Sequence, residues 1–139
     1  MERSLVLIKP DAIRRRLGGA IISRLEGQGL KTVALKMLHM DKALAERHYA
    51  VHAGKPFFAD LISYITSTPI IAVVFEGNRA VETIRKIMGA TDPAKAEAGT
   101  IRHDFGLDVQ QNSVHGSDAP ETAEKEIKLF FAKDEIFSY

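Results

Sequence analysis

The sequence contains no cysteine, and this absence excludes two kinds of stabilising chemistry. Without a thiol in its 139 residues, the chain can form neither a disulfide framework nor a thiolate metal site. The absence agrees with a cytoplasmic location, which we expect for this chain. With 45% hydrophobic and 27% charged residues, the composition is that of a globular protein, and residues 1–139 are predicted to form a single domain.

A charge excess and long apolar runs are missing as well. Lys and Arg number 19 against 18 Asp and Glu, a net charge of +1, so no global field attracts nucleic acid or an anionic membrane. The apolar run Ser4–Lys9 is too short for a signal sequence, and no run approaches the ~20 residues of a membrane span. We expect no membrane partner and no specific nucleic-acid partner.

Glycine-rich phosphate loops are also absent. Neither GxxxxGKS/T nor GxGxxG follows a predicted strand, since Gly27 and Gly29 come after a predicted helix. Any phosphates would therefore have to be bound by side chains. Four candidates stand at the ends of predicted elements or in loops: Lys9, Arg85, Thr91 and Arg102. Taken singly, each is more simply explained as a solvated or capping residue.

The hydrophobic pattern predicts alternating strands and helices, with apolar runs as strands and apolar residues at helical spacing as helices. Strands are expected at Ser4–Lys9, Leu30–Met40, Pro69–Gly77 and Val109–His115. Helices are expected at Ala12–Glu26, Lys42–His52, Pro56–Ser67, Asn78–Met88 and Ala119–Phe131. In the second strand, the alternation puts Val33, Leu35 and Met37 on the buried face.

This order of elements predicts an α+β fold of the ferredoxin-like βαββαβ kind, a four-stranded antiparallel sheet with helices packed on one face. Fold alone does not give function. RNA-binding sheets share this topology, but the third strand, Ile70 to Phe75, lacks the spaced aromatic and basic residues of an RNA-binding motif. An RNA-binding role is therefore not favoured.

One histidine stands at the end of the last predicted strand, just before a tight turn. Gly116 lets the backbone approach a ligand, Ser117 supplies a hydroxyl, and Asp118 is expected to cap the next helix, with Glu121 completing a capping box. On these residues alone, a structural His115 is as well supported as a functional one.

The helix that follows carries a carboxylate on its apolar side. A period of ~3.6 residues places Glu126 beside Ile127 and Phe130, away from solvent. A carboxylate there needs a partner. Glu126 could accept a hydrogen bond from one ring nitrogen of His115, fix its tautomer and leave the other nitrogen as a nucleophile.

Two other histidines have a spacing that can bind a metal. His48 and His52 are four residues apart on a predicted helix. Because no third ligand stands at a convincing spacing, we interpret them as a surface pair, and we predict no metal-ligand set from the protein.

Six segments, in chain order, resemble those of nucleoside diphosphate kinases, and the resemblance covers almost the whole chain. The segments are Leu7–Ala12, His48–Tyr49, Lys55–Phe58, Gly89–Pro93, Gly99–Arg102 and Asn112–Asp118. The last of these, NSVHGSD, is the most specific. Ala12, His103 and Gln110-Gln111 depart from the usual family pattern, which puts local loop geometry in question but no matched site residue.

The resemblance implies a role for each matched residue. His115 would accept the phosphoryl group, oriented by Glu126, and Ser117 would hydrogen-bond that carboxylate. Further roles implied are those of Lys9 and Tyr49 at the terminal phosphate, Arg85, Thr91 and Arg102 at the phosphates, Asn112 and Lys9 at the ribose, and Phe57, Val109 and Leu61 at the base.

The resemblance also implies an activity. The chain would transfer the terminal phosphoryl group between nucleoside tri- and diphosphates by a ping-pong mechanism with low base specificity, and Mg²⁺ would arrive with the nucleotide. It implies a homo-oligomer, a tetramer or a hexamer, and the apolar tail from Phe130 to Phe137 suggests a contact with a neighbouring subunit. The alternative is a non-catalytic nucleotide- or protein-binding regulatory module of the same fold.

Overall fold

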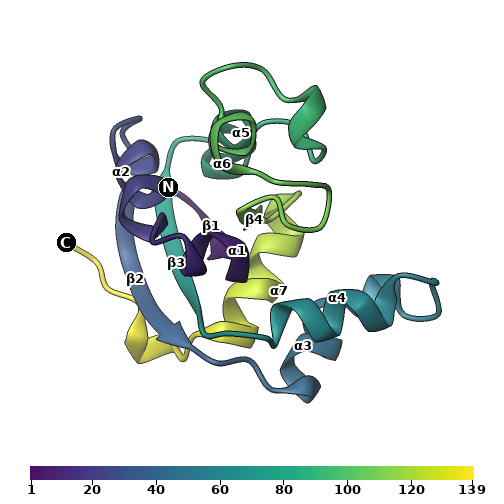
Figure 1. The fold of residues 1–139 in the computed structure, drawn as a ribbon. Helices are drawn as coiled ribbons and strands as arrows, with labels where there is room; N and C mark the ends of the chain where they lie inside the picture. The colour runs from purple at the N-terminus through teal and green to yellow at the C-terminus, as the bar shows by residue number, and fades with distance from the viewer.

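The computed structural model describes residues 1–139 and confirms the ferredoxin-like α+β fold (Figure 1). Its four strands form one antiparallel sheet in the order β2-β3-β1-β4. The strands are β1 (Glu2–Ile8), β2 (Lys31–Leu38), β3 (Ile70–Gly77) and β4 (Val114–Gly116). The α-helices are α1 (Pro10–Arg14), α2 (Gly18–Glu26), α3 (Lys42–His48), α4 (Phe58–Ile65), α5 (Ala80–Met88), α6 (Ile101–Phe105) and α7 (Pro120–Phe130). Short 3-10 turns lie at Ala50–His52, Pro93–Lys95 and Lys133–Glu135.

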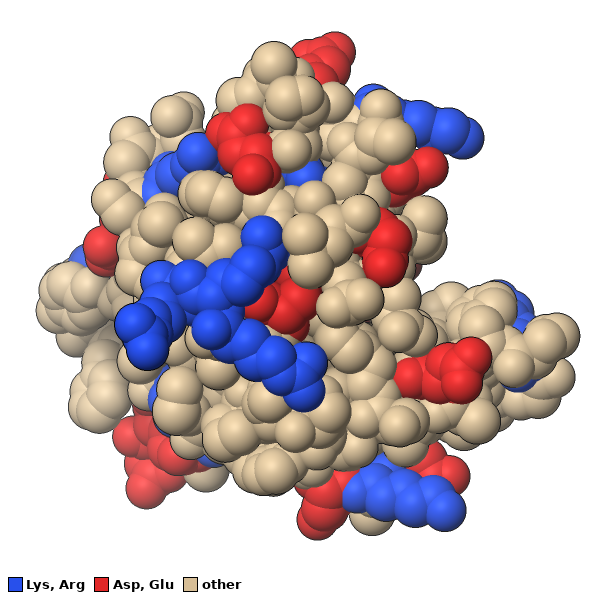
Figure 2. Space-filling model, viewed as in Figure 1, with Lys and Arg blue, Asp and Glu red and all other residues tan.

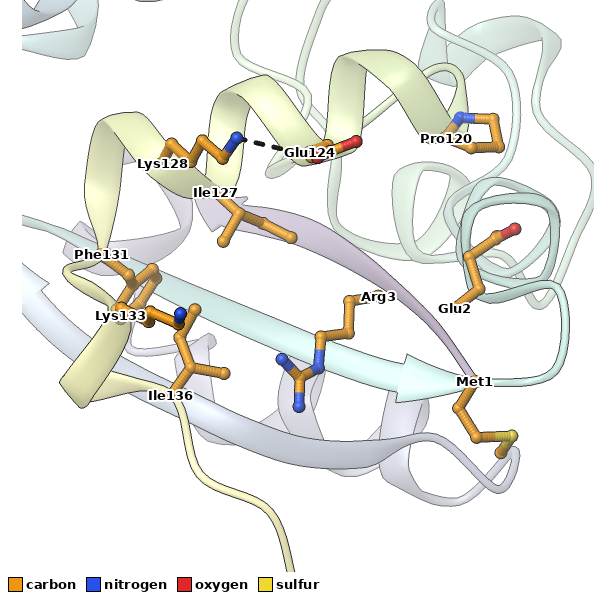
Figure 3. A pocket seen from close by; sticks show the side chains of 10 residues that line it. All are labelled: Met1, Glu2, Arg3, Pro120, Glu124, Ile127, Lys128, Phe131, Lys133 and Ile136. Atoms are coloured by element: carbon orange, nitrogen blue, oxygen red, sulfur yellow. Dashed lines mark ion pairs between the residues drawn. The ribbon is translucent and has the colours of Figure 1, made fainter.

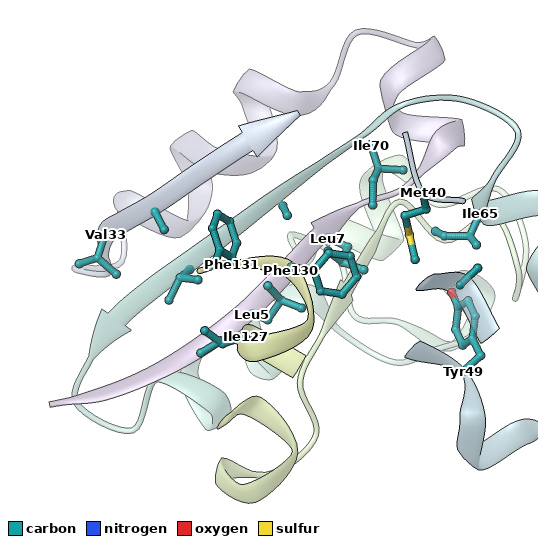
Figure 4. Close-up of a cluster of buried hydrophobic side chains, with 14 of the residues drawn as sticks. Leu5, Leu7, Val33, Met40, Tyr49, Ile65, Ile70, Ile127, Phe130 and Phe131 are labelled. Carbon is teal, nitrogen blue, oxygen red and sulfur yellow. The ribbon is translucent and has the colours of Figure 1, made fainter. Parts of the chain in front are cut away.

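Helices cover both faces of the sheet, whereas the pattern predicted one covered face. On one face, residues of α3, α4 and α7 pack against Leu5 and Leu7 of β1 (Figure 4). On the other face, residues of α2, α5 and α6 pack against Val6 and Ile8. Successive side chains of a strand point to opposite faces. The unbroken apolar run of β1, with these four residues 0% exposed, is therefore that of a strand buried on both sides.

The single helix predicted at Ala12–Glu26 is two helices, α1 and α2. Arg16 between them has φ 61°, the left-handed conformation that ends many helices. The N–H of Leu17 donates to the carbonyl of Ala12 at 2.9 Å, and that of Arg16 to the carbonyl of Ile13 at 3.0 Å. This is the hydrogen-bond pattern of a glycine-type helix end, which the sequence conceals because an arginine occupies the glycine position.

The buried face of β2 changes along the strand. Its pairing with β3 shifts register between Thr32 and Ala34, as at a β-bulge. Val33 is buried as predicted, but Leu35 and Met37 are 52% and 59% exposed. One extra residue reverses which side chains face inward, so the prediction was wrong for these two residues.

The last strand and the start of the last helix also differ from the prediction. Only the end of Val109–His115 is extended, because Ser113 has φ 75° and β4 begins after it. Helix α7 begins at a proline with Ala119 as its N-cap and no side-chain cap. The predicted cap by Asp118 was therefore wrong, because the N-cap position falls one residue later, at Ala119, whose side chain has no hydrogen-bond acceptor.

The C-terminal segment returns to the sheet. Phe130 and Phe131 belong to the chain's own core, 3% and 6% exposed. The N–H of Phe137 then donates to the carbonyl of Val33 at 2.9 Å, while the Phe137 side chain stays 63% exposed. Only the last part of the apolar tail thus remains open to another molecule.

The surface carries both signs of charge. Figure 2 shows acidic and basic side chains interspersed among uncharged ones, with one group of basic side chains over the region of α1. Arg14, Arg15 and Arg16 at the end of that helix are exposed. None of the helices has the length and apolarity that crossing a bilayer would need.

Candidate functional site

His115 is positioned by the short strand β4. Antiparallel pairing with β1 places His115 opposite Leu7. The next residue, Gly116, lies so close to α5 that an added Cβ would stand 2.8 Å from the sulfur of Met88. Because Gly116 has no side chain, β4 packs closely against α5 without displacing the end of the Met88 side chain.

The predicted pairing of His115 with Glu126 is present. Nε2 of His115 lies 3.0 Å from Oε2 and 3.1 Å from Oε1 of Glu126, and Ser117 Oγ donates to Oε1 at 2.6 Å. Burial opposes ionisation of Glu126, yet the hydrogen bonds and charge of His115 and the bond from Ser117 hold its pKa below the ordinary value. An ionised carboxylate only accepts, so in the neutral ring the proton is on Nε2 and Nδ1 keeps its lone pair.

His48 joins this pair, and the prediction of a surface residue was wrong. It is 8% exposed, its ring lies edge-on to that of His115 with centroids 4.7 Å apart, and its Nδ1 is 3.7 Å from Oε2 of Glu126. Neither ring nitrogen has a hydrogen-bond partner. Burial, with a contribution from His115, lowers the pKa of His48 to about 3. The three-residue spacing from buried Ala45 is the helical signal that places His48 inward.

His115 opens onto a cleft of about 440 Å³. No carboxylate lines this cleft. Its walls are formed by Lys9, Tyr49, His52, Phe57, Leu61, Thr91, Arg102, Val109, Gln110, Asn112, Val114 and His115. Nine of these were predicted from the sequence, and the three that were missed are His52, Gln110 and Val114. Cations without acidic neighbours in the cleft suit an anionic ligand.

Lys9 follows β1 and is buried, with 6% of its surface exposed. Its Nζ donates to Oδ1 of Asn112 at 2.9 Å and to the carbonyl of Gln110 at 2.8 Å. Nδ2 of Asn112 donates in turn to the carbonyl of Thr91 at 2.9 Å. Burial, with a contribution from the charge of Arg102, lowers the pKa of Lys9 to about 8.

Arg102 approaches the cleft from α6, a helix that the sequence did not predict. It is 7% exposed, and its guanidinium donates to the carbonyls of Gly89 at 3.1 Å and Val114 at 3.0 Å. Its Nε has no partner. Burial, then the charge of Arg85, lowers the pKa of Arg102 to about 10. Two main-chain carbonyls thus hold the guanidinium in place, while its Nε–H has no acceptor within the chain.

Three predicted site residues do not line the cleft. Glu126 and Ser117 lie behind His115, in contact with its ring or with each other. Arg85, in the last turn of α5, lines a neighbouring groove together with Asp118. Its charge nevertheless acts on Arg102, so Arg85 stands at the border of the site.

The mouth of the cleft is apolar. Phe57 and Val109 are 45% and 56% exposed, which leaves much of their apolar surface open, and Leu61 also lines the cleft. The ring of His52 stands 5.4 Å from that of Phe57. Exposed apolar surface at a cleft mouth is suited to a flat, partly apolar ligand group.

A larger hollow, about 510 Å³, lies elsewhere, between the start of β1, α7 and the C-terminal segment (Figure 3). Ile127, Phe131 and Ile136 form its apolar part, and Met1 and Arg3 border it. It contains no histidine and none of the cleft residues. Size alone therefore does not identify the site.

The fold and the cleft define a ferredoxin-like protein in which an oriented imidazole faces a cation-lined pocket with an apolar mouth. The family model described as nucleoside diphosphate kinase matches residues 2–136. The chain belongs to the nucleoside diphosphate kinase family.

Relatives and solved structures of this family match the chain over nearly its whole length. Nucleoside diphosphate kinases of Dehalococcoides mccartyi strain BAV1 and Methanothermobacter thermautotrophicus are 58% and 57% identical over 100% of this chain and 98% and 93% of their own length. The Halobacterium salinarum enzyme, solved in complex with CDP, is 48% identical with a TM-score of 0.97, over 99% of this chain and 92% of that one. The Aquifex aeolicus enzyme is 38% identical with a TM-score of 0.95, over 98% and 99%.

The family and these relatives give the activity. The chain is a phosphotransferase that binds nucleotides and acts as a nucleoside diphosphate kinase. None of these findings favours the non-catalytic module of the same fold.

Proposed function

We propose that His115 carries the phosphoryl group between two nucleotides. The observation that carries this proposal is the hydrogen bond from Nε2 to Glu126, which leaves the lone pair of Nδ1 for the cleft. Nδ1 attacks the terminal phosphorus of a nucleoside triphosphate, the bond to the bridging oxygen breaks, and the diphosphate leaves. A terminal oxygen of a second diphosphate then attacks the phosphohistidine and restores the free ring.

Lys9, Tyr49, Arg85, Thr91 and Arg102 bind the phosphates in this proposal. Its support is the burial of Lys9 and Arg102, since charges removed from water act more strongly on developing negative charge. The transition state of phosphoryl transfer is loose, with charge on its equatorial oxygens. Fixed cations at that position therefore stabilise it without further rearrangement.

The ion of the proposed reaction is Mg²⁺, carried by the nucleotide. The cleft offers cations but no carboxylate, a donor set that fits phosphates rather than the metal itself. Mg²⁺ retains water and binds phosphate oxygens in many such sites. When bound, it neutralises charge on the phosphates, and the chain's own residues hold and orient those phosphates.

The base and ribose occupy the outer part of the cleft. We assign the base to the space between Phe57 and Val109 beside Leu61, and the ribose hydroxyls to Asn112 and Lys9. Stacking on a π-face does not distinguish the bases, so specificity for the base is low. The relative from Halobacterium salinarum was solved with CDP, which supports a nucleotide ligand for this cleft.

We further assign residues 1–139 to one kinase domain that acts in the cytoplasm as a homo-oligomer, a tetramer or a hexamer. The exposed side chains of Leu35, Met37 and Phe137 support self-association, because Leu35 and Met37 lie on one face of β2 and exposed apolar surface can form a contact between subunits. The lack of cysteine fits a reducing compartment. No membrane or specific nucleic-acid partner is assigned.

The test is labelling with γ-³²P-ATP and Mg²⁺ followed by peptide mapping. We expect acid-labile, alkali-stable label on the peptide that contains His115, and its discharge by added diphosphate. His115→Ala should lose the label and the transfer activity, while the control His39→Gln, an exposed histidine, should keep both. Labelling of His115→Ala at the wild-type level would refute the assignment.

A further inference from the structure

Three side chains of types that can bind a metal meet behind the face of His115 that opens to the cleft. They come from α3, α7 and β4, which converge beside one another in the fold (Figure 1). His48, His115 and Glu126 each offer one ligand atom, and these atoms lie within 4.8 Å of one another. Because the sequence showed no third ligand near His48, only the folded chain reveals this set.

The separations of the two imidazoles from the carboxylate fit a small cation. In a tetrahedral zinc site with bonds of about 2.0–2.1 Å, neighbouring ligand atoms stand about 3.3 Å apart. Oε2 of Glu126 lies 3.0 Å from Nε2 of His115 and 3.7 Å from Nδ1 of His48, which brackets that value. Two imidazoles and one glutamate form a ligand set known for zinc, with a fourth position for water.

His48 supplies the second, independent observation. More than nine-tenths buried, it directs a polar ring toward the carboxylate, yet neither ring nitrogen has a hydrogen-bond partner. Buried polar groups without a partner are uncommon and call for an explanation. An imidazole nitrogen that accepts no hydrogen bond keeps its lone pair available for a metal.

The hydrogen bond to the other oxygen of the Glu126 carboxylate is also compatible with metal binding. Ser117 Oγ donates to Oε1 of Glu126 at 2.6 Å, which leaves Oε2 as the oxygen nearest both rings. Hydrogen bonds of this kind orient metal-binding carboxylates. Nitrogen donors favour Zn²⁺ over Mg²⁺, which requires oxygen ligands.

We propose that His48, Glu126 and His115 form an inhibitory binding site for Zn²⁺, distinct from the Mg²⁺ carried by the nucleotide. A metal on Nε2 of His115 replaces the proton there, and that proton moves to Nδ1, since a neutral imidazole carries one proton. Nδ1 then has no lone pair with which to attack phosphorus. This consequence for catalysis rests on the proposed role of His115, whereas the binding itself does not.

The first experiment measures zinc binding without catalysis. Titration calorimetry of nucleotide-free wild-type protein with ZnCl₂ should show one ion per chain, and MgCl₂ should give no comparable binding. His48→Phe should weaken zinc binding by at least about 10-fold, and the control His39→Gln should leave it unchanged. Equal zinc affinity in wild type and a folded His48→Phe would overturn the proposal.

A second experiment needs no variant. Wild-type crystals soaked in ZnCl₂ and measured at the zinc absorption edge should show an anomalous peak between His48, His115 and Glu126. No peak at that position would overturn the proposed site, whether or not His48→Phe folds.

The last measurement separates this proposal from the proposed function. Wild-type protein pre-incubated with Zn²⁺ should lose most of the label from γ-³²P-ATP at His115, and a zinc-selective chelator should restore it. Full labelling in the presence of bound zinc would overturn the inhibition. A protein that fails to label His115 even without zinc would instead defeat the role of His115 as acceptor.

Discussion

The pKa of Lys9 gives a prediction for nucleotide binding. Burial lowers this pKa from its ordinary 10.5 to about 8, which corresponds to roughly 3 kcal/mol. The folded-state pKa lies below the unfolded one, so between pH 8 and 10.5 the unfolded chain holds a proton that the folded chain has lost. This contribution to folding stability therefore rises with pH across that window.

Nucleotide binding should raise the pKa of Lys9 again, because the phosphates favour the charged amine. Below pH 8 Lys9 is already protonated, but at pH 9 about nine-tenths of it is neutral and must take up a proton on binding. We expect Mg²⁺-ADP to bind about 10-fold more weakly at pH 9 than at pH 7, with almost one proton taken up per nucleotide.

Titration calorimetry in buffers of different ionisation enthalpy measures both quantities. Lys9→Met is the matched control, since it retains most of the buried stem but has no proton to gain. It should bind more weakly than wild type at pH 7 and show little further loss by pH 9. A wild-type protein that takes up no proton at pH 9, or a variant with the same pH profile, would refute the reasoning.

Three further predictions concern single side chains. Glu126→Gln should keep the fold but slow phosphoryl transfer about 10-fold or more, because the amide holds the required tautomer less firmly; single-turnover labelling measures this, and an unchanged rate would make the carboxylate structural. Arg102→Ala should reduce kcat/KM by at least about 100-fold, as charged hydrogen bonds to phosphate are lost, while unchanged steady-state kinetics would place Arg102 outside the site. Arg16→Gly should raise the free energy of unfolding by about 1 kcal/mol, because Arg16 has φ 61° and glycine adopts this conformation without strain; lower stability in urea unfolding would contradict this.

Much of the fold could be predicted because its signals are local. The continuous apolar run of β1 and the run between Pro69 and Gly77 that forms β3 are recognisable as strands from the sequence. The inward face of α7 follows from helical spacing, with Glu126 buried as expected. The break at Arg16 and the register shift between Thr32 and Ala34 could not be predicted in this way. Each depends on a single residue, and neither leaves a signal in the local sequence pattern.

In the candidate site, too, local features could be predicted and contacts between distant segments could not. The segment Asn112–Asp118 left a structural and a functional His115 equally supported by its residue types, and it indicated a site only together with Glu126 on the next helix and the family resemblance. The contacts within the cleft could not be predicted, since Lys9 and Asn112 are far apart in the chain and meet at 2.9 Å only through the pairing of β1 with β4. His48 was misjudged because its spacing to His52 is local, while its contact with His115 is not.

By itself, the sequence determined the class of fold, the family resemblance, and the pairing of His115 with a carboxylate on the following helix, because these depend on periodicity and short segments. Only the tertiary structure decided that Lys9 is buried beside Arg102, that helices cover both faces of the sheet, and that His48 lies against His115 and Glu126. Burial and proximity between distant segments exist only once the chain has packed, and they set the charge state and the unused hydrogen-bonding capacity of these groups.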